Sequence, residues 1–277
     1  MGLRIATNLS SITAQRSLAG SSRELQKSFA QLSSGSRITK SADDAAGLAV
    51  SENLKSQIRS YSQAGRNSMD GVSLVQTAEG GLNEISNILT RLRELGVQAS
   101  SDTVGETERS FLNKEVLQLK NEAQRIAKST KFGNVALLDG SSGKFDFQVG
   151  IGNDDFNDRI SFDSSAQEAT ASALGIDGLD YASKEDAQNS LETLDKAQTM
   201  VNGFRANLGA IQNRLVSTQD NIGVMHENLS AANSRIRDTD IAQSSAEVTR
   251  NQIMQQATVS VLANANASQQ SALKLIG

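Results

Sequence analysis

Asp43 and Asp44 are adjacent carboxylates, a side-chain type that can act as a general acid or base. Ser41 precedes Asp44 by three residues, and an apolar helical run follows, which is the pattern of a capping box. In such a box the side chains accept backbone N–H groups that have no partner within the helix. We therefore predict that this pair caps a helix and is not a catalytic site.

Three other groups have residue types suited to chemistry but lack the required pattern. His226 is the sole histidine of a chain without cysteine, which argues against a metal centre or a serine-type triad. Asp154, Asp155 and Asp158 lack the glycine and terminal glutamate of an EF-hand, so we expect a solvated acidic turn. Residues 150–152 lack the third glycine and the following helix of a nucleotide-binding loop. We predict no catalytic residue, no metal ligand and no cofactor.

The composition favours long helices and disfavours a protein that binds nucleic acid. The 277 residues include no cysteine, proline or tryptophan, and the net charge is −4 without a block of five basic residues. Without proline, no residue of the chain enforces a helix kink. Residues 141–186 contain ten acidic and three basic residues, so this segment carries −7 and the rest +3. We expect the acidic segment to face water and the chain ends to face protein.

Apolar residues recur at steps of three and four over three long stretches. This spacing predicts helices over 45–99, 105–130 and 187–236. Gly133 is expected to end the helix 105–130 by adopting a left-handed backbone conformation. A helix of about 45 residues is roughly 65 to 70 Å long at about 1.5 Å per residue, so residues 45–237 are expected to form a rod. The seam of the last helix includes Leu194, Val201, Leu208, Ile211, Leu215 and Ile222.

Between the second and third of these helices the apolar period changes to two. Phe145 and Phe147 alternate with polar residues before a turn, and Ile160 and Phe162 follow it, which predicts a β-hairpin at about 141–163. Residues 164–186 are rich in Ser, Ala, Asp and Gly and are expected to form a surface connector. The predicted fold class is mainly α: a long coiled-coil-like helical rod with one small β-hairpin, plus paired N- and C-terminal helices.

The two chain ends predict helices that have no place in the rod. From residue 251 to 273 no charged residue occurs, but eight Asn and Gln side chains make a membrane span unfavourable. Such a helix is better buried among protein helices, and these must come from other copies of the chain. The predicted self-assembly residues are Ile5, Leu9, Ile12, Leu18, Leu25, Phe29, Leu32, Met254, Ala257, Val261, Leu262, Leu273 and Ile276.

Several long motifs, in the same order along the chain, resemble those of bacterial flagellins. The N-terminal matches are LSSGSRI (32–38), SADDAAGLA (41–49), SQAGRNSMDG (62–71), QTAEGGL (76–82) and RLREL (91–95). The C-terminal matches are LGAIQNRL (208–215), NLSAANSRI (228–236) and QQATVSVLA (255–263). The resemblance covers almost the whole chain, and the connector is too short for a variable outer domain. It therefore implies a minimal flagellin.

The resemblance implies a non-enzymatic structural subunit that self-assembles into the extracellular flagellar filament for motility. Residues 1–44 and 238–277 would supply the helices of an inner tube, and residues 45–237 the outer tube. Implied partners are other copies of the chain, hook-junction and filament-cap proteins and an export chaperone. No cleaved signal peptide is expected, because polar residues interrupt the first 15 positions.

Two alternatives to a filament subunit follow from the same residues. A hook–filament junction protein has similar termini, but the motif at 91–95 and the C-terminal match favour a filament subunit. A flagellin-like enzyme would need a catalytic insert such as the zinc protease motif His-Glu-x-x-His. One histidine is too few for that motif.

Arg91, Leu95 and Glu115 match positions that contact the flagellin-specific Toll-like receptor of animals in the flagellins that activate it. Arg91 and Leu95 lie one helical turn apart, and Glu115 would meet them if the second helix runs antiparallel to the first. The same residues are also expected to hold neighbouring rods together. Gly96, where related flagellins often carry Ala, lowers helix propensity by roughly 1 kcal/mol next to this contact.

Overall fold

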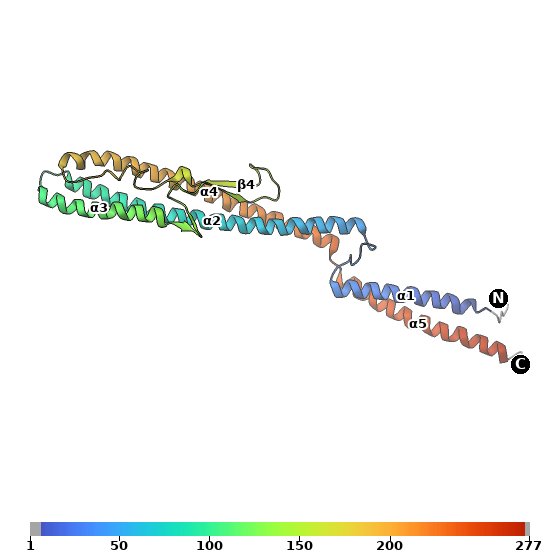
Figure 1. The fold of residues 1–277 in the computed structure, drawn as a ribbon. Coiled ribbons are helices and arrows are strands. Elements are labelled where there is room, and N and C mark those ends of the chain that lie inside the picture. The colour runs from blue at the N-terminus through green and yellow to red at the C-terminus, as the bar shows by residue number, and fades with distance from the viewer. Residues whose placement is uncertain (1–6, 275–277) are drawn as a thin grey trace. The chain divides into compact units, whose positions relative to one another are not determined.

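The computed structural model describes residues 7–274, and the side chains of residues 7–268. Over this range the chain is mainly helical, with two small antiparallel strand pairs, which confirms the predicted fold class (Figure 1). In chain order the elements are α1 (Leu9–Ser34), α2 (Ala45–Ala99), α3 (Glu106–Ser129), β1 (Lys131–Phe132), β2 (Val135–Ala136), β3 (Lys144–Gln148), β4 (Arg159–Asp163), the 3-10 turn η1 (Ser165–Gln167), α4 (Lys184–Arg237) and α5 (Ile241–Lys274).

The chain forms two compact units. One contains Gln57–Glu227, and the other combines Met1–Ser56 with Asn228–Gly277. We call them the central unit and the terminal unit. Both boundaries fall inside long helices, α2 and α4, whereas the division expected from the sequence follows the ends of these helices at residues 45 and 237.

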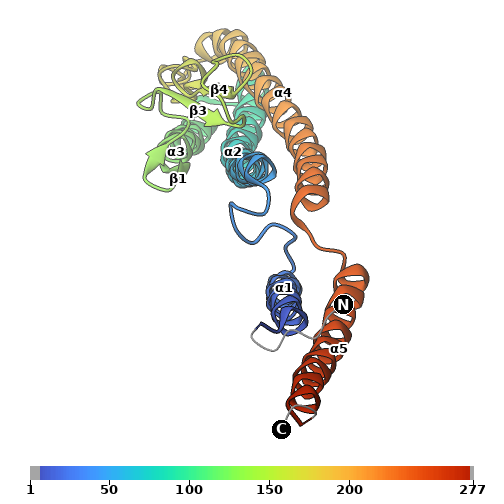
Figure 2. The ribbon, with the colours of Figure 1, turned by 90° about the vertical axis from the view of Figure 1, so that its right-hand side faces the viewer.

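The core of the central unit lies between α2, α3 and α4, which run side by side in Figures 1 and 2. Buried residues recur along α2 at steps of three and four, as the amphipathic spacing of a helix requires. α3 adds smaller buried side chains, and α4 supplies a matching seam. Fully buried members include Leu82, Ile85, Leu89, Leu92, Val116, Ala123, Leu194, Val201, Leu208 and Leu215. Burial of each leucine contributes about 1.5–3 kcal/mol, so this seam holds the three helices together.

The predicted hairpin is formed by β3 and β4, which pair antiparallel with Phe145 opposite Phe162. The two rings stack with centroids 5.9 Å apart, and Phe162 is fully buried. α2 makes room for the hairpin at Gly71, where an added Cβ would lie 3.1 Å from the ring of Phe147 and 3.2 Å from Leu215. The alternation of apolar residues therefore places one face of the hairpin on the helix pair α2 and α4.

The role predicted for Gly133 is wrong. α3 ends at Ser129, and the N–H of Thr130 donates to the carbonyl of Ile126. Gly133 has a φ of 60° in the tight turn that joins β1 to β2. The left-handed backbone conformation was anticipated correctly, but it reverses a strand pair that the sequence pattern did not predict.

The segment 164–186 is not the surface connector that its composition suggests. Leu174, Ile176, Leu179 and Tyr181 are buried and belong to the same core as α2, α3 and α4. Their spacing follows neither a helical nor a strand period, because turns at Gly175 and Gly178 direct each apolar side chain inward separately. The acidic residues of the segment nevertheless include exposed ones, such as Asp177 and Asp180.

In the terminal unit α1 and α5 pack antiparallel. At one end Nδ2 of Asn8 donates to the carbonyl of Ala265 (3.0 Å), and at the other the N–H of Thr239 donates to the carbonyl of Gly35 (3.0 Å). Asn8 also caps α1 by accepting the N–H of Ser11 at 3.0 Å. Gly35, with a φ of 66°, ends α1 in the left-handed conformation.

Candidate assembly and recognition surfaces

Small side chains form the seam between α1 and α5. The buried residues of α1 are Ser11, Ala14 and Ser28, and those of α5 are Ser244, Val248 and Thr258. The steps are three and fourteen along α1 and four and ten along α5, and each is a sum of the threes, fours and sevens of the coiled-coil period. Small side chains let two helices approach closely but bury little apolar area, so this pairing gains little from the hydrophobic effect.

The larger predicted self-assembly residues divide into two groups around this seam. Leu18, Leu25, Leu32 and Leu262 are half-buried at its edges. Of the other predicted residues, Leu9, Ile12, Phe29, Met254 and Val261 are exposed. With Ile241, Ile253 and Val259, α1 and α5 expose eight large apolar side chains among those described. Ala257 is exposed as well. Ile5 and Ile276 lie outside the described residues, and Leu273 lies outside the described side chains.

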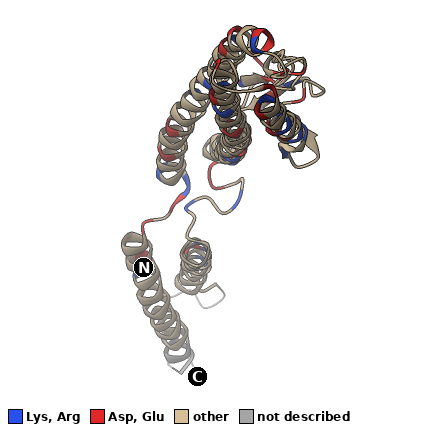
Figure 3. Cartoon of the chain, turned by 90° about the vertical axis from the view of Figure 1, so that its left-hand side faces the viewer, with Lys and Arg blue, Asp and Glu red and all other residues tan. Residues whose placement is uncertain are grey.

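The α5 part of this exposed apolar surface is almost free of charge. No charged residue occurs in 251–273, and Figure 3 shows α5 with hardly any blue or red beyond its first turns. Exposed apolar groups of this extent on a soluble chain mark an interaction surface. None of the helices described is long and apolar enough to cross a membrane.

The Asp43–Asp44 pair orders the segment that leads from α1 into α2, but not as a capping box. Asp44 is itself the N-cap of α2, because its Oδ1 accepts the N–H of Gly47 at 2.8 Å and the helix begins at Ala45. The predicted register, with Ser41 as the cap, was therefore three residues too early. Both carboxylates still serve backbone structure, as expected.

Asp43 closes the turn before α2. Its Oδ2 accepts the N–H and hydroxyl of Thr39 (3.1 and 2.9 Å) and the N–H of Lys40 (3.1 Å), and Lys27 lies 3.5 Å from its other oxygen. The pKa of Asp43 is lowered to about 2, mainly by the hydrogen bonds from the Thr39 hydroxyl and the Lys40 amide. The Thr39 amide and the positive charge of Lys27 lower this pKa further. The turn is therefore held by an ionised carboxylate.

Arg91 and Glu115 form the ion pair that an antiparallel α2 and α3 would allow. Nη2 of Arg91 lies 2.9 Å from Oε1 of Glu115, and its Nη1 lies 3.0 Å from Oε2 of Glu94. Hydrogen bonds to Glu115 and then Glu94 raise the pKa of Arg91 above its usual range. All three charged side chains are substantially exposed, so a partner could reach them.

Leu95 does not share this exposed patch. Its side chain is 2% exposed and belongs to the core of the central unit, because it continues the steps of three and four from Leu92 to Ala99 that form the buried seam. The predicted apolar contact of Leu95 with a receptor is corrected accordingly. Glu94, which the sequence reasoning left out, takes its place beside Arg91 on the surface.

Gly96 has a packing role that its effect on helix propensity did not reveal. An added Cβ would lie 3.2 Å from the hydroxyl of Tyr181 and 3.1 Å from Cδ2 of Leu191. The Tyr181 hydroxyl donates to the carbonyl of Leu92 at 2.9 Å, and burial raises the pKa of Tyr181 to about 12. The glycine thus admits a buried tyrosine from segment 164–186 against α2.

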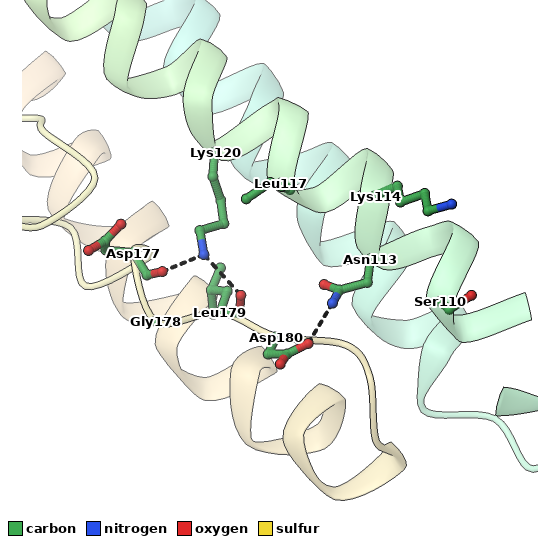
Figure 4. A pocket seen from close by; sticks show the side chains of 9 residues that line it. All are labelled: Ser110, Asn113, Lys114, Leu117, Lys120, Asp177, Gly178, Leu179 and Asp180. Atoms are coloured by element: carbon green, nitrogen blue, oxygen red, sulfur yellow. Dashed lines mark hydrogen bonds between the residues drawn. The ribbon is translucent and has the colours of Figure 1, made fainter. Parts of the chain in front are cut away.

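Hydrogen bonds cross a hollow of about 410 Å³ between α3 and residues 177–180 (Figure 4). Lys120 donates to the carbonyls of Leu179 (3.0 Å) and Asp177, and Nδ2 of Asn113 donates to Asp180 at 2.7 Å. These bonds satisfy backbone carbonyls of a turn and tie it to α3. These hydrogen bonds therefore position segment 164–186 against α3.

The acidic turn 153–158 is built by its own carboxylates. Oδ1 of Asp154 accepts the N–H groups of Phe156 (2.8 Å) and Asn157 (2.9 Å), and Oδ2 of Asp158 accepts the N–H of Asp154 (3.0 Å). Asp155 pairs with Arg159.

His226 is half-buried on α4. Within the side chains described, no three His, Asp or Glu residues gather as a metal site would require.

Comparison with known proteins places these surfaces in a family. The model of the bacterial flagellin N-terminal helical region matches residues 5–143, and that of the C-terminal helical region matches residues 191–276. The chain belongs to the bacterial flagellin family. The first region contains α1, α2 and α3, and the second contains α5 and most of α4.

Similar proteins agree over almost their whole lengths. A flagellin of Halalkalibacterium halodurans is 41% identical over 97% of this chain and 98% of its own length. The flagellar filament 30.7 kDa core protein of Treponema maltophilum is also 41% identical, with the same coverage of each chain. The crystal structure of a Bacillus cereus flagellin matches with 30% identity and a TM-score of 0.50, over 61% of this chain and 94% of that one.

Proposed function

We propose that the chain is the structural subunit of an extracellular bacterial flagellar filament, in which copies of the terminal unit bury one another's exposed apolar faces. The observation that carries this proposal is the division within α1 and α5, whose small residues form the seam while eight large apolar side chains stay in water. Names of the relatives, flagellin and flagellar filament core protein, support the same function.

The exposed side chains offer enough free energy to drive association. Full burial of a Leu, Ile, Val, Met or Phe side chain gains about 1.5–3 kcal/mol, and roughly half of each of the eight remains to be buried. The gross gain is then on the order of 8 kcal/mol per copy, before the losses of motion that association brings. Because the terminal helices pair through small residues, copies supply most of their apolar packing.

In this proposal residues 1–44 and 238–277 form the inner tube of the filament and residues 45–237 the outer tube. Hook-junction and filament-cap proteins and an export chaperone are the further partners, and the chain is exported without a cleaved signal peptide. The apolar residues of α1 and α5 then serve assembly alone, and no catalytic step is part of the function. A junction protein remains the alternative, and its signature would be a monomer that does not polymerise by itself.

A receptor contact at Arg91 and Glu115 is a second proposal. It is supported by the exposed ion pair between α2 and α3, with Glu94 beside it. In the filament, neighbouring central units would pack over this charged patch. A Toll-like receptor would therefore contact it only on the free monomer. Signalling by folded monomers but not by intact filaments would support this role, and silent folded monomers would refute it.

Deletion of residues 250–277 tests the filament role. The central unit contains its own core and should stay folded, whereas the truncated chain should fail to polymerise because most of the exposed apolar face of α5 is gone. Circular dichroism would report helix content, and electron microscopy with light scattering would report polymers. Normal filaments from the truncated chain would refute the assignment of assembly to the terminal unit.

A further inference from the structure

Arg16 is a lone charge within a long uncharged stretch of the terminal unit. Residues 7–22 contain no other charged residue, and residues 251–268 contain none at all. These two stretches belong to the antiparallel helices α1 and α5. Arg16 is exposed, and among the described residues it has neither a hydrogen bond nor an ion pair. The charge therefore lies on the surface that assembly is proposed to bury.

Burial of this guanidinium demands a partner. Arginine keeps its proton at any pH that a folded protein meets, so it cannot escape burial by becoming neutral. An ion removed from water without a partner is strongly unfavourable, whereas a carboxylate that accepts two of its N–H groups offsets much of that loss. No acidic residue occurs in 7–22 or 251–268, so the partner must lie elsewhere.

The same unit has a hollow of about 350 Å³ where α1, α5 and the segments joining them to α2 and α4 meet. Its charged lining comprises the carboxylates Glu24, Asp238, Asp240 and Glu247 and the cations Lys27, Arg37 and Arg235. Two of the cations are already engaged, because Lys27 lies 3.5 Å from Asp43 and Arg37 donates to the carbonyl of Ile236 at 2.8 Å. The hollow therefore holds four carboxylates, and Arg235 is the one cation of its lining without a hydrogen bond or ion pair to another described residue.

Among these carboxylates we single out Glu24, because it lies on α1 itself, whereas Asp238 lies in the segment between α4 and α5 with its backbone bridged to Ser36. Asp240 caps α5 by accepting the N–H of Ala242 at 2.8 Å, and Glu247 accepts a 3.4 Å bond from Gln243. Glu24 is exposed and has no partner among the described residues. More than two turns of α1 separate it from Arg16, so the two residues are distinct points on this helix.

We propose that Arg16 of one copy pairs with Glu24 in the hollow of a second copy, and that this contact fixes how the terminal units dock. Complementary charge assigns the occupant, because the exposed apolar faces alone allow copies to slide along one another. A contact that joins two different points of the surface is heterologous, and repetition of such a contact gives an open polymer. This inference rests on the proposed filament function and adds the residues that set its geometry.

Charge reversal in the full-length chain tests the pair. Arg16→Glu and Glu24→Arg should each raise the critical concentration for polymerisation, measured by sedimentation, about tenfold or more. The double variant should return it to within about threefold of the wild type. Arg23→Glu is the matched control, because Arg23 is exposed on the same helix and its Nε donates to the carbonyl of Ala19 of α1 itself. This control should shift the critical concentration less than about threefold.

The outcomes separate this inference from the filament role. Circular dichroism of the monomers would first show that Arg16→Glu leaves helix content unchanged. Wild-type polymerisation by that variant, no recovery in the double variant, or equal impairment by Arg23→Glu would each overturn the proposed pair while leaving self-assembly intact. Only polymerisation of the chain without residues 250–277 would overturn the filament role itself. The contact would be established if both single variants polymerise poorly and the double variant recovers polymerisation.

Discussion

Replacement of Gly96 by alanine opposes two effects whose sizes the structure allows us to compare. Alanine in the last turn of α2, which ends at Ala99, favours the helix by up to about 1 kcal/mol relative to glycine. Its Cβ, however, would lie 3.2 Å from the hydroxyl oxygen of Tyr181 and 3.1 Å from Cδ2 of Leu191. The leucine methyl can rotate away, but the hydrogen bond to the carbonyl of Leu92 holds the tyrosine in place. The tyrosine hydroxyl is therefore the obstacle.

Crowding at a buried position costs about 1–3 kcal/mol, so Gly96→Ala should destabilise the central unit by up to about 2 kcal/mol despite its better propensity. Tyr181→Phe alone loses one buried hydrogen bond, worth about 1 kcal/mol. In the double variant the phenyl ring no longer carries the atom that the new methyl group meets. The two changes should then be less harmful together than their sum, by about 1 kcal/mol or more.

Urea unfolding of the four monomeric proteins, followed by circular dichroism, measures this coupling. Strictly additive effects, or a full 1 kcal/mol of stabilisation in Gly96→Ala, would refute the argument that the hydroxyl limits space at this position. An alkaline titration gives an independent check. Burial raises the pKa of Tyr181 to about 12 from an ordinary 10.0, so its contribution is complete below pH 10 and is lost as the pH rises through 12. Tyr181→Phe should lack that loss.

Four further substitutions test other parts of the structure. Gly150→Ala should destabilise the hairpin by about 1–3 kcal/mol, because the new Cβ would lie 2.8 Å from the backbone Cα of Asp158, and thermal unfolding would show it. Asp43→Asn should speed hydrogen exchange at the Thr39 and Lys40 amides, whose N–H groups the carboxylate accepts. In the wild type this protection is present above an ordinary pKa of 3.8 and is lost as the pH falls through about 2. Equal exchange in both proteins at neutral pH would contradict this expectation. Leu95→Ala should cost about 2–5 kcal/mol of monomer stability, whereas Arg91→Ala should leave urea unfolding nearly unchanged.

The helices and the hairpin could be predicted because their apolar residues are periodic. Steps of three and four through Leu82 and Leu92, or through Leu194 and Leu215, leave one helix face apolar, and alternation around Phe145 leaves one strand face apolar. No such period exists in 164–186. There each buried side chain is placed by a separate turn, and composition alone, rich in Ser, Asp and Gly, indicates a surface segment.

Large apolar residues that are exposed on α1 and α5 could be selected from the sequence, but the seam of small residues between the two helices was missed. Leu9 and Ile12 are large and apolar and were therefore predicted as contact residues. The residues that are buried against α5 are Ser11, which lies between them, and Ala14, which follows them. A seam of small residues has no hydrophobic signal, so only the step pattern of Ser and Ala could have indicated it. Leu95 shows the opposite error, since a motif match gave no information about burial.

The buried course of segment 164–186 also determines where a chain of this kind can grow longer. Ile176, Leu179 and Tyr181 must keep their places in the core, so an added domain cannot interrupt them without opening the central unit. Exposed backbone resumes at residues 182 and 183, directly after the tyrosine and just before α4 begins at Lys184. An extra domain or a displayed peptide inserted at this point would be flanked by the buried Tyr181 on one side and by α4 on the other, so both ends of the insertion would be held in place.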